Sequence, residues 1–190
     1  MTTTPSLQKS ITTGAIGFCL VSLCVFATVA FAERWMYRTL GLTGAYLAWT
    51  LLFVVLSGGV FGSLAVVRWR LPKFFLLWAL AFFAYAAAWV IAYFALRNTT
   101  GELLGSLAGS VSMALVFCLG FGSLGSTLKL SAVLFVSNAL GYFVGAALYY
   151  SLGRPLGMLL WGVAYGLFFG AGIGAALHFV QQEWISTDKR

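Results

Sequence analysis

Six long apolar stretches separated by short polar segments make up most of this sequence; they cover residues 11–32, 42–67, 74–96, 103–128, 130–152 and 156–180. Each stretch exceeds the about 20 residues that a helix needs to cross the hydrocarbon core of a bilayer. Backbone groups in lipid must be hydrogen-bonded within their segment, and the stretches lack the two-residue alternation of barrel strands. The pattern predicts an all-α, polytopic membrane helix bundle with six transmembrane helices.

The composition agrees with a membrane protein and excludes other classes. Of the 190 residues, 62% are hydrophobic and 8% are charged, whereas a soluble domain carries roughly a quarter charged residues. Aromatic residues make up 17% of the chain, which excludes a disordered tail, and the 3 cysteines cannot pair completely in a disulfide scaffold. No segment resembles a linker. We therefore expect one integral membrane domain over residues 1–190, located in a cell membrane (inner or plasma membrane).

The charged residues all lie outside the six stretches, and their distribution predicts the orientation. If the N-terminus is cytoplasmic, seven Lys and Arg residues lie inside and four lie outside. Because cytoplasmic loops are enriched in Lys and Arg, both termini are predicted to be cytoplasmic. Three of the inner cations, Arg68, Arg70 and Lys73, share one loop and form a candidate binding site for anionic lipid headgroups. The remaining cations are scattered, so nucleic acid is not expected as a partner.

The first stretch has a second interpretation, as a cleaved signal peptide. Lys9 precedes it, and it ends in Ala30-Phe31-Ala32, which resembles a signal-peptidase site. Cleavage there would leave five helices. The stretch is longer than the roughly 7 to 15 apolar residues of a signal peptide, so we expect the helix to be retained.

A short motif favours an arrangement of three helical hairpins. Phe61-Gly62-Ser63-Leu64 recurs at residues 121–124 and more loosely at residues 169–172, each time toward the cytoplasmic end of an even-numbered helix. Because about one such match is expected by chance in a chain of this composition, the motif is a weak indication of a repeat.

Glycines recur every four residues on the last stretch, at Gly162, Gly166, Gly170 and Gly174. Such a stripe lets another helix backbone approach closely, so we interpret it as a helix-packing surface. The alternative is a sliding or gating surface, as transporters need when one bundle moves against another. Weaker ladders of small residues occur on three other stretches, at Ser137, Gly141 and Gly145, at Ala84, Ala88 and Ala92, and at Gly105 and Gly109.

Asn138 is the only amide or charged side chain deep within any stretch, and it is the first candidate site because lipid opposes such a group. At helical spacing it shares a face with Tyr142 and Tyr149. One interpretation is that Asn138 hydrogen-bonds a neighbouring helix and fixes its register. The other is that this face lines a solute cavity together with Tyr85, Trp89 and Tyr93, which are also spaced by four residues.

The chain offers little chemistry for catalysis or for binding metals. His178 is the only histidine, and Cys19, Cys24 and Cys118 lack the spacing of metal ligands, so neither a metal nor a cofactor is expected. A serine on the fourth helix and a histidine on the sixth resemble the arrangement of the rhomboid family. Ser123 is followed by Leu124, however, where that family has glycine. We therefore expect that the protein is not an enzyme.

Three functions fit this sequence. One is a lipid-interacting protein that uses Arg68, Trp69, Arg70 and Lys73 against anionic headgroups. A six-helix protein of this size is similar in scale to the substrate-binding components of energy-coupling-factor transporters, although their Ala-x-x-x-Ala pattern is absent from the first helix. That resemblance implies small-solute transport or substrate capture. The alternative is a non-catalytic structural or assembly subunit of a larger membrane complex. The expected partners are membrane lipids, with other membrane subunits or further copies of the chain.

Overall fold

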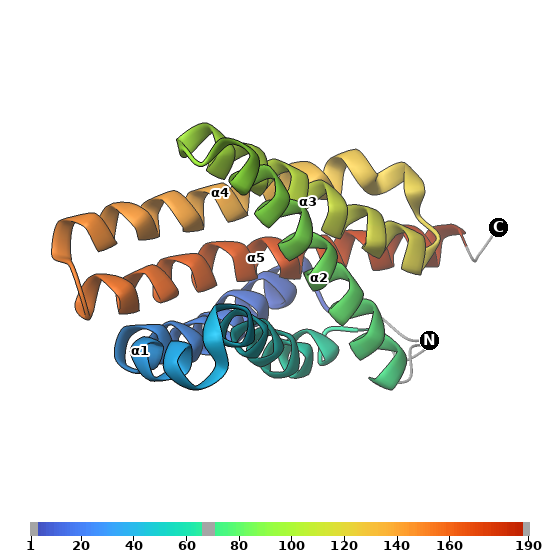
Figure 1. The fold of residues 1–190 in the computed structure, drawn as a ribbon. Coiled ribbons are helices and arrows are strands. Elements are labelled where there is room, and N and C mark those ends of the chain that lie inside the picture. Colours follow the sequence, from blue (N-terminus) through green and yellow to red (C-terminus); the bar gives the residue numbers. More distant parts are fainter. Residues whose placement is uncertain (1–3, 66–70, 188–190) are drawn as a thin grey trace.

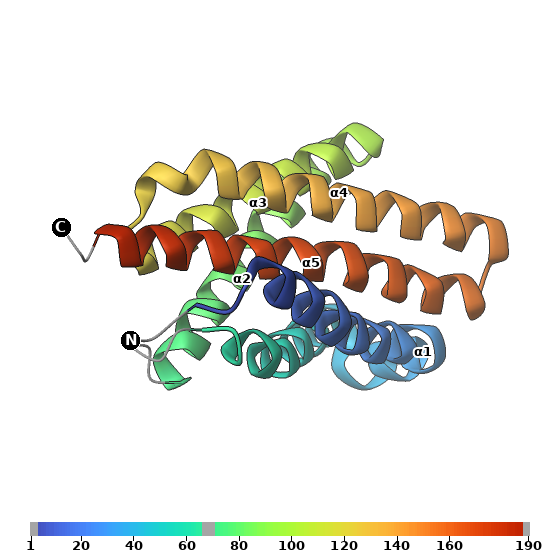
Figure 2. The ribbon, with the colours of Figure 1, turned by 180° about the vertical axis from the view of Figure 1, so that it is seen from behind.

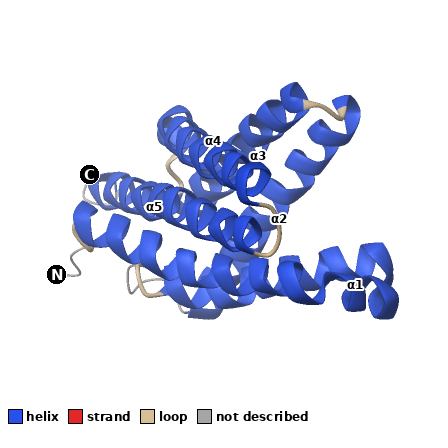
Figure 3. Cartoon of the chain, turned by 90° about the vertical axis from the view of Figure 1, so that its left-hand side faces the viewer, coloured by secondary structure: helices blue, strands red, loops and turns tan. Residues whose placement is uncertain are grey.

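The computed structural model of this chain describes residues 4–65 and 71–187. Within these ranges the structure contains five α-helices, one short 3₁₀ helix and no strand (Figures 1 and 3). The elements are α1 (Leu7–Gly62), α2 (Leu71–Leu96), α3 (Thr99–Phe121), η1 (Leu124–Ser126), α4 (Thr127–Leu152) and α5 (Leu156–Thr187). All five α-helices are long and apolar enough to cross a membrane. The predicted all-α membrane class is therefore confirmed, whereas six helices stay a prediction.

The first predicted stretch and residues 42–62 of the second fall within the single element α1, which consists of two helical segments joined at Gly41. Gly41 has φ 68° and ψ 178°, a conformation that is essentially restricted to glycine. Beyond Gly41 the second half of α1 runs back along the first half. Two contacts show this: the Trp49 indole donates to Thr28 Oγ1 at 3.0 Å, and Val60 lies against Gly17. Figure 1 shows this reversal between the blue and the turquoise segments.

Capping residues explain where α3 begins and ends. The Asn98 side chain accepts a hydrogen bond from the Gly101 amide at 2.9 Å, so α3 begins before the predicted residue 103. Gly122 adopts a left-handed conformation with φ 67° and ends α3 at Phe121 rather than at residue 128. The prediction of one helix through residue 128 is therefore wrong, because this glycine cap lies inside an apolar stretch.

Helix α5 lies at the centre of the bundle, between α1 and α4, and α2 packs on α3 (Figures 1 and 2). Both ends of the chain lie at the same end of the bundle. There the His178 imidazole lies 2.9 Å from the Pro5 carbonyl oxygen, so the segment before α1 contacts α5. The membrane face that this end occupies stays a prediction.

Large aromatic side chains fill the half of the bundle that holds the termini. Phe61 packs on Trp78 with ring centres 4.7 Å apart, and Trp78 stacks on Phe117 at 6.2 Å. The Trp78 indole also donates a hydrogen bond to Ser57 Oγ at 3.0 Å. Phe61, Trp78 and Phe117 are fully buried, so this half of the bundle has a packed aromatic core.

The outer surface is apolar, as expected for helices that face lipid. Large hydrophobic side chains are exposed on every α-helix, including Leu20, Ile91, Leu119, Leu140 and Leu167. An apolar surface of this extent is unusual on a soluble monomer. The exposed faces of the helices therefore support a location in a membrane.

Candidate functional site: an aromatic cavity

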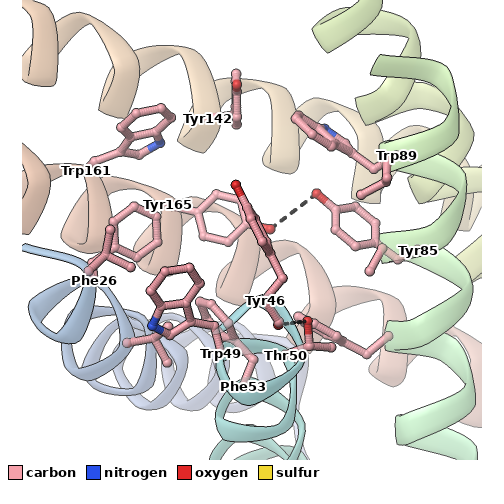
Figure 4. A pocket seen from close by; sticks show the side chains of 15 residues that line it. Phe26, Tyr46, Trp49, Thr50, Phe53, Tyr85, Trp89, Tyr142, Trp161 and Tyr165 are labelled. Carbon is pink, nitrogen blue, oxygen red and sulfur yellow. Dashed lines mark hydrogen bonds between the residues drawn. The ribbon is translucent and has the colours of Figure 1, made fainter. Parts of the chain in front are cut away.

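A cavity of about 300 Å³ lies among α1, α2, α4 and α5, and we call it the aromatic cavity (Figure 4). Fifteen residues line it, and none of them is charged. Ten of the fifteen are aromatic: Phe26, Tyr46, Trp49, Phe53, Phe82, Tyr85, Trp89, Tyr142, Trp161 and Tyr165. The chain thus gathers aromatic residues from four helices around one space.

The aromatic cavity lies in the half of the bundle away from the termini. Trp161 is close to the start of α5 at Leu156, and Trp89 is close to the end of α2 at Leu96. At 1.5 Å per residue these rings lie about 8 to 10 Å from the helix ends. A solute could thus reach the cavity without crossing the packed aromatic core.

Glycines of α3 hold the aromatic residues of α2 in the cavity wall. Tyr85 and Trp89, spaced by one helical turn, pack against Gly109 and Gly105 respectively. A Cβ atom on Gly109 would lie 2.7 Å from Tyr85 Cδ2, and one on Gly105 would lie 3.2 Å from Trp89 Cδ1. Both distances leave little or no room for a larger residue. The α3 ladder noted in the sequence therefore makes room for cavity aromatics.

The same arrangement recurs between α4 and α5. Tyr165 packs against Gly141, where a Cβ atom would lie 3.0 Å from the Tyr165 Cα atom. The Trp161 indole lies directly against Gly145. Two glycine ladders thus back two pairs of aromatic residues, and both pairs point into the aromatic cavity (Figure 4).

Asn138 anchors a hydrogen-bonded chain behind this wall. Tyr85 donates from its hydroxyl to Asn138 Oδ1 at 2.8 Å, and the Tyr165 hydroxyl lies 3.2 Å from that of Tyr85. Because the Tyr85 proton is used on Asn138, the Tyr165 hydroxyl must donate to Tyr85. Asn138 is fully buried, and its Nδ2 atom has no hydrogen-bond partner among the described residues.

Tyr142 lies between the two tryptophans of the wall (Figure 4). Its ring centre is 5.7 Å from that of Trp89 and 5.4 Å from that of Trp161. Its hydroxyl donates to Glu102 Oε1 at 3.1 Å. Both indole N–H groups are buried and have no hydrogen-bond partner in the part of the chain that the structure describes.

A second cavity, of about 420 Å³, lies at the α2–α3 turn and against α4. It is more polar than the aromatic cavity, since its lining includes Arg97, Asn98 and Glu102. The Tyr142–Glu102 hydrogen bond joins the linings of the two cavities. We call this second space the polar cavity.

The residues predicted from the sequence as one polar and aromatic face occupy different places. Tyr142 lines the aromatic cavity, together with Tyr85 and Trp89 of α2. Asn138 lies behind the wall rather than in it, because Tyr85 and Tyr165 cover it. Tyr149 is outside the cavity lining and packs on Trp161 with ring centres 5.7 Å apart.

The sequence pattern indicates three of the ten aromatic lining residues, Tyr85, Trp89 and Tyr142, and misses the other seven. Trp161 sits near a predicted helix end, where a tryptophan is typical of the membrane interface, yet it lines the cavity. Tyr165 and the α1 residues Tyr46 and Trp49 also lie outside the face that the sequence predicts. The spacing of Trp161 and Tyr165, which matches that of Tyr85 and Trp89, was the signal available.

The four glycines of the α5 stripe lie against the first half of α1. Gly166 faces the backbone of Cys19, and Gly170 faces the backbone of Gly14. Gly162 faces Phe26 and Gly174 faces Ser10. This segment of α1 precedes Ala32, so cleavage of a signal peptide would uncover the whole stripe.

The candidate headgroup-binding loop is described only in part. Arg68 and Arg70 lie outside the described residues, whereas Lys73 is exposed in the first turn of α2. At the opposite end of the bundle Arg154 pairs with Glu33, with Nη1 and Oε2 2.5 Å apart. The hydrogen bond to Glu33 raises the pKa of Arg154 above its ordinary value.

The described residues contain no group of three His, Cys, Asp or Glu side chains that could hold a metal ion. Comparison of the chain with protein-family models, curated proteins and solved structures finds no match. The function is therefore argued from the geometry of the site.

Proposed function

We propose that this chain is a multi-pass cell-membrane protein that binds a small solute in the aromatic cavity, as a transporter or as a substrate-capture subunit. The aromatic cavity carries this proposal. Its volume of about 300 Å³ lies at the lower end of the range for small-molecule sites. Such sites are mostly apolar and hold a few polar groups that fix the orientation of the ligand, and the hydroxyls and indoles of this wall fit that description.

The buried indole N–H groups of Trp89 and Trp161 favour solute binding over a purely structural role. A buried donor without a partner destabilises a protein by about 1 to 3 kcal/mol. Two such donors next to one cavity are therefore unfavourable for a bundle that serves packing alone. A solute with acceptor atoms offers both donors a partner.

The glycine stripe gives little support to the alternative, an assembly subunit. A stripe of small residues suits a partner subunit only where another chain can reach it. Here α1 covers Gly166 and Gly170 within the same chain. The helix-packing surface is therefore used in folding this protein.

We also propose that binding is not followed by a chemical reaction. The lining of the aromatic cavity contains no Ser, Cys, His, Asp, Glu or Lys side chain. These are the residue types that act most often as nucleophile, general acid or general base. The site can hold and orient a molecule, which is what transport or capture requires.

A metabolite-capture experiment tests the proposed function. The full chain in lipid nanodiscs is incubated with a metabolite extract, washed, and denatured, and the released compounds are identified by mass spectrometry. Ala86 lines the cavity, so Ala86→Phe fills part of it, whereas the neighbouring Ala87 is exposed on the lipid side. We expect the parent and Ala87→Phe to retain the same compound and Ala86→Phe to lose it.

Thermal unfolding of the three proteins shows whether each variant is folded. Equal retention by the parent and a folded Ala86→Phe would place binding elsewhere. Retention of no compound by the parent would contradict solute binding itself.

A further inference from the structure

The lining of the aromatic cavity limits the charge of its ligand. None of its fifteen residues is Asp, Glu, Lys, Arg or His. A charged solute that enters the cavity loses its hydration shell and finds no counter-ion there. An uncharged solute avoids this cost.

The nearest ends of the helices also disfavour a cation. Four arginines lie on the segments at this end of the bundle, against two glutamates, at Arg34, Arg38, Arg97, Arg154, Glu33 and Glu102. Glu33 is paired with Arg154, and Glu102 accepts a hydrogen bond from Tyr142. The aromatic faces attract cations, but the surrounding charge is positive and both carboxylates already have partners.

The shape of the wall suits a flat molecule. Trp89, Tyr142 and Trp161 follow one another along one side of the cavity, and Tyr85 and Tyr165 lie one helical turn along from Trp89 and Trp161 (Figure 4). Aromatic rings pack best against other rings in stacked or edge-to-face geometry. A planar ring between these side chains can make both kinds of contact.

The tryptophans differ in what their N–H groups can offer a ligand. The Trp49 N–H already donates to Thr28 Oγ1 at 3.0 Å. Those of Trp89 and Trp161 have no partner among the described residues, and the Tyr142 ring lies between them. A ligand that displaces this ring meets both donors, which acceptor atoms such as carbonyl oxygens would satisfy.

We infer that the ligand of the aromatic cavity is an uncharged, planar ring compound with hydrogen-bond acceptors, and that it binds by displacing the Tyr142 ring from between Trp89 and Trp161. This inference rests on the proposed solute-binding function and names the class of solute. The Tyr142–Glu102 hydrogen bond keeps the ring in place before binding. Its rupture would open the aromatic cavity toward the polar cavity.

Four probe compounds test the class of ligand by isothermal titration calorimetry on the full chain in lipid nanodiscs. Benzamide is neutral, planar and carries a carbonyl acceptor. Benzoate and benzyltrimethylammonium keep its ring but are charged, and cyclohexanecarboxamide keeps its amide but lacks the flat ring. We expect benzamide to bind about tenfold or more tightly than each of the other three.

Two tryptophan variants test the role of the indole donors. Trp89→Phe keeps a ring but removes an unpaired N–H, and we expect it to weaken benzamide binding about fivefold to tenfold. Trp78→Phe is the matched control, because Trp78 lies outside the cavity lining and its N–H is already bonded to Ser57. It should leave benzamide affinity within about twofold of the parent while lowering thermal stability.

The possible results separate this inference from the proposed function. Equal or tighter binding of benzoate, benzyltrimethylammonium or cyclohexanecarboxamide would overturn the inference but leave solute binding intact. An equal loss of benzamide affinity in folded Trp89→Phe and Trp78→Phe would show that the unpaired indole N–H groups do not bind the ligand. If none of the probes binds while the parent retains a metabolite that Ala86→Phe loses, the inferred class is wrong and the proposed function stands.

Discussion

At the residue scale, Asn138 links three helices through the hydroxyls of Tyr85 and Tyr165. Asn138→Leu removes the acceptor of Tyr85 and leaves that hydroxyl unpaired. We expect the free energy of unfolding to fall by about 1 kcal/mol, the scale of a hydrogen bond within a membrane. Because Asn138 lies behind the cavity wall, stability should change more than solute binding. Thermal unfolding of the variant in mild detergent measures the effect.

A double-mutant cycle provides the control for this prediction. Tyr85→Phe removes the other partner of the same hydrogen bond, so the two effects should not add when both changes are combined. Full additivity would show that the Tyr85–Asn138 bond makes no contribution. Loss of solute binding in Asn138→Leu at parental stability would instead place Asn138 in direct contact with the solute.

Gly145 controls the position of Trp161. A Cβ atom at Gly145 overlaps the indole, so Gly145→Ala must displace Trp161 or spread α4 from α5. Overpacking of this kind usually costs about 1 to 3 kcal/mol. Gly59 is a matched control, because a Cβ atom there meets nothing within 4 Å. We expect Gly145→Ala to unfold at a lower temperature than the parent and Gly59→Ala to unfold at or above the parental temperature.

The sequence identified some of the cavity residues because they share a helical face. Tyr85 and Trp89 are spaced by one helical turn. Asn138, behind the cavity wall, stands out because an amide side chain is unfavourable in lipid. Periodicity describes one helix at a time, however, and gives no information about which helices are neighbours. The pairing of Trp161 and Tyr165 with Gly145 and Gly141 depends on how α4 packs on α5, so it could be seen only in the structure.

At the element scale, the contact between α1 and α5 depends on the glycine stripe. Gly166 and Gly170 face the backbones of Cys19 and Gly14, where no side chain fits. We therefore expect Gly166→Leu or Gly170→Leu to prevent folding or to lower stability by more than the about 1 to 3 kcal/mol of ordinary overpacking. Yield and thermal unfolding in mild detergent report the effect.

Cys24 offers a control on the opposing helix. It is exposed on α1, so Cys24→Leu should leave stability close to that of the parent. Normal stability of both glycine variants would mean that α5 does not pack on α1 as closely as the structure shows.

Helix boundaries show what hydropathy can and cannot define. The apolar stretches locate the helices, because each must be long enough to cross a bilayer. The end of α3 depends instead on the left-handed backbone of Gly122, and the reversal in α1 depends on Gly41. Both glycines lie within or beside apolar stretches, where nothing in the hydropathy marks them.

At the scale of the whole molecule, the fold and the distribution of Lys and Arg give independent information about the membrane topology. The structure places both ends of the chain at one end of the bundle (Figure 1), where Pro5 contacts His178. This arrangement agrees with the prediction that both termini lie on one side of the membrane, but it does not identify the side. The seven-to-four distribution of Lys and Arg predicts that this side is the cytoplasm.

Reporter fusions to each terminus test both statements at once. We expect the N-terminal and the C-terminal fusions to report from the cytoplasm. If both report from the outer side, the orientation derived from the charges is wrong while the fold stands. If they report from opposite sides, the chain crosses the membrane an odd number of times, which contradicts the return of α1 at Gly41 or the contact between the N-terminal segment and α5.

A C-terminal fusion in the cytoplasm on a mature chain that lacks its first 32 residues would show that the signal-peptide interpretation is correct. The aromatic cavity would then lose Phe26, and α5 would lose the helix that covers its glycines.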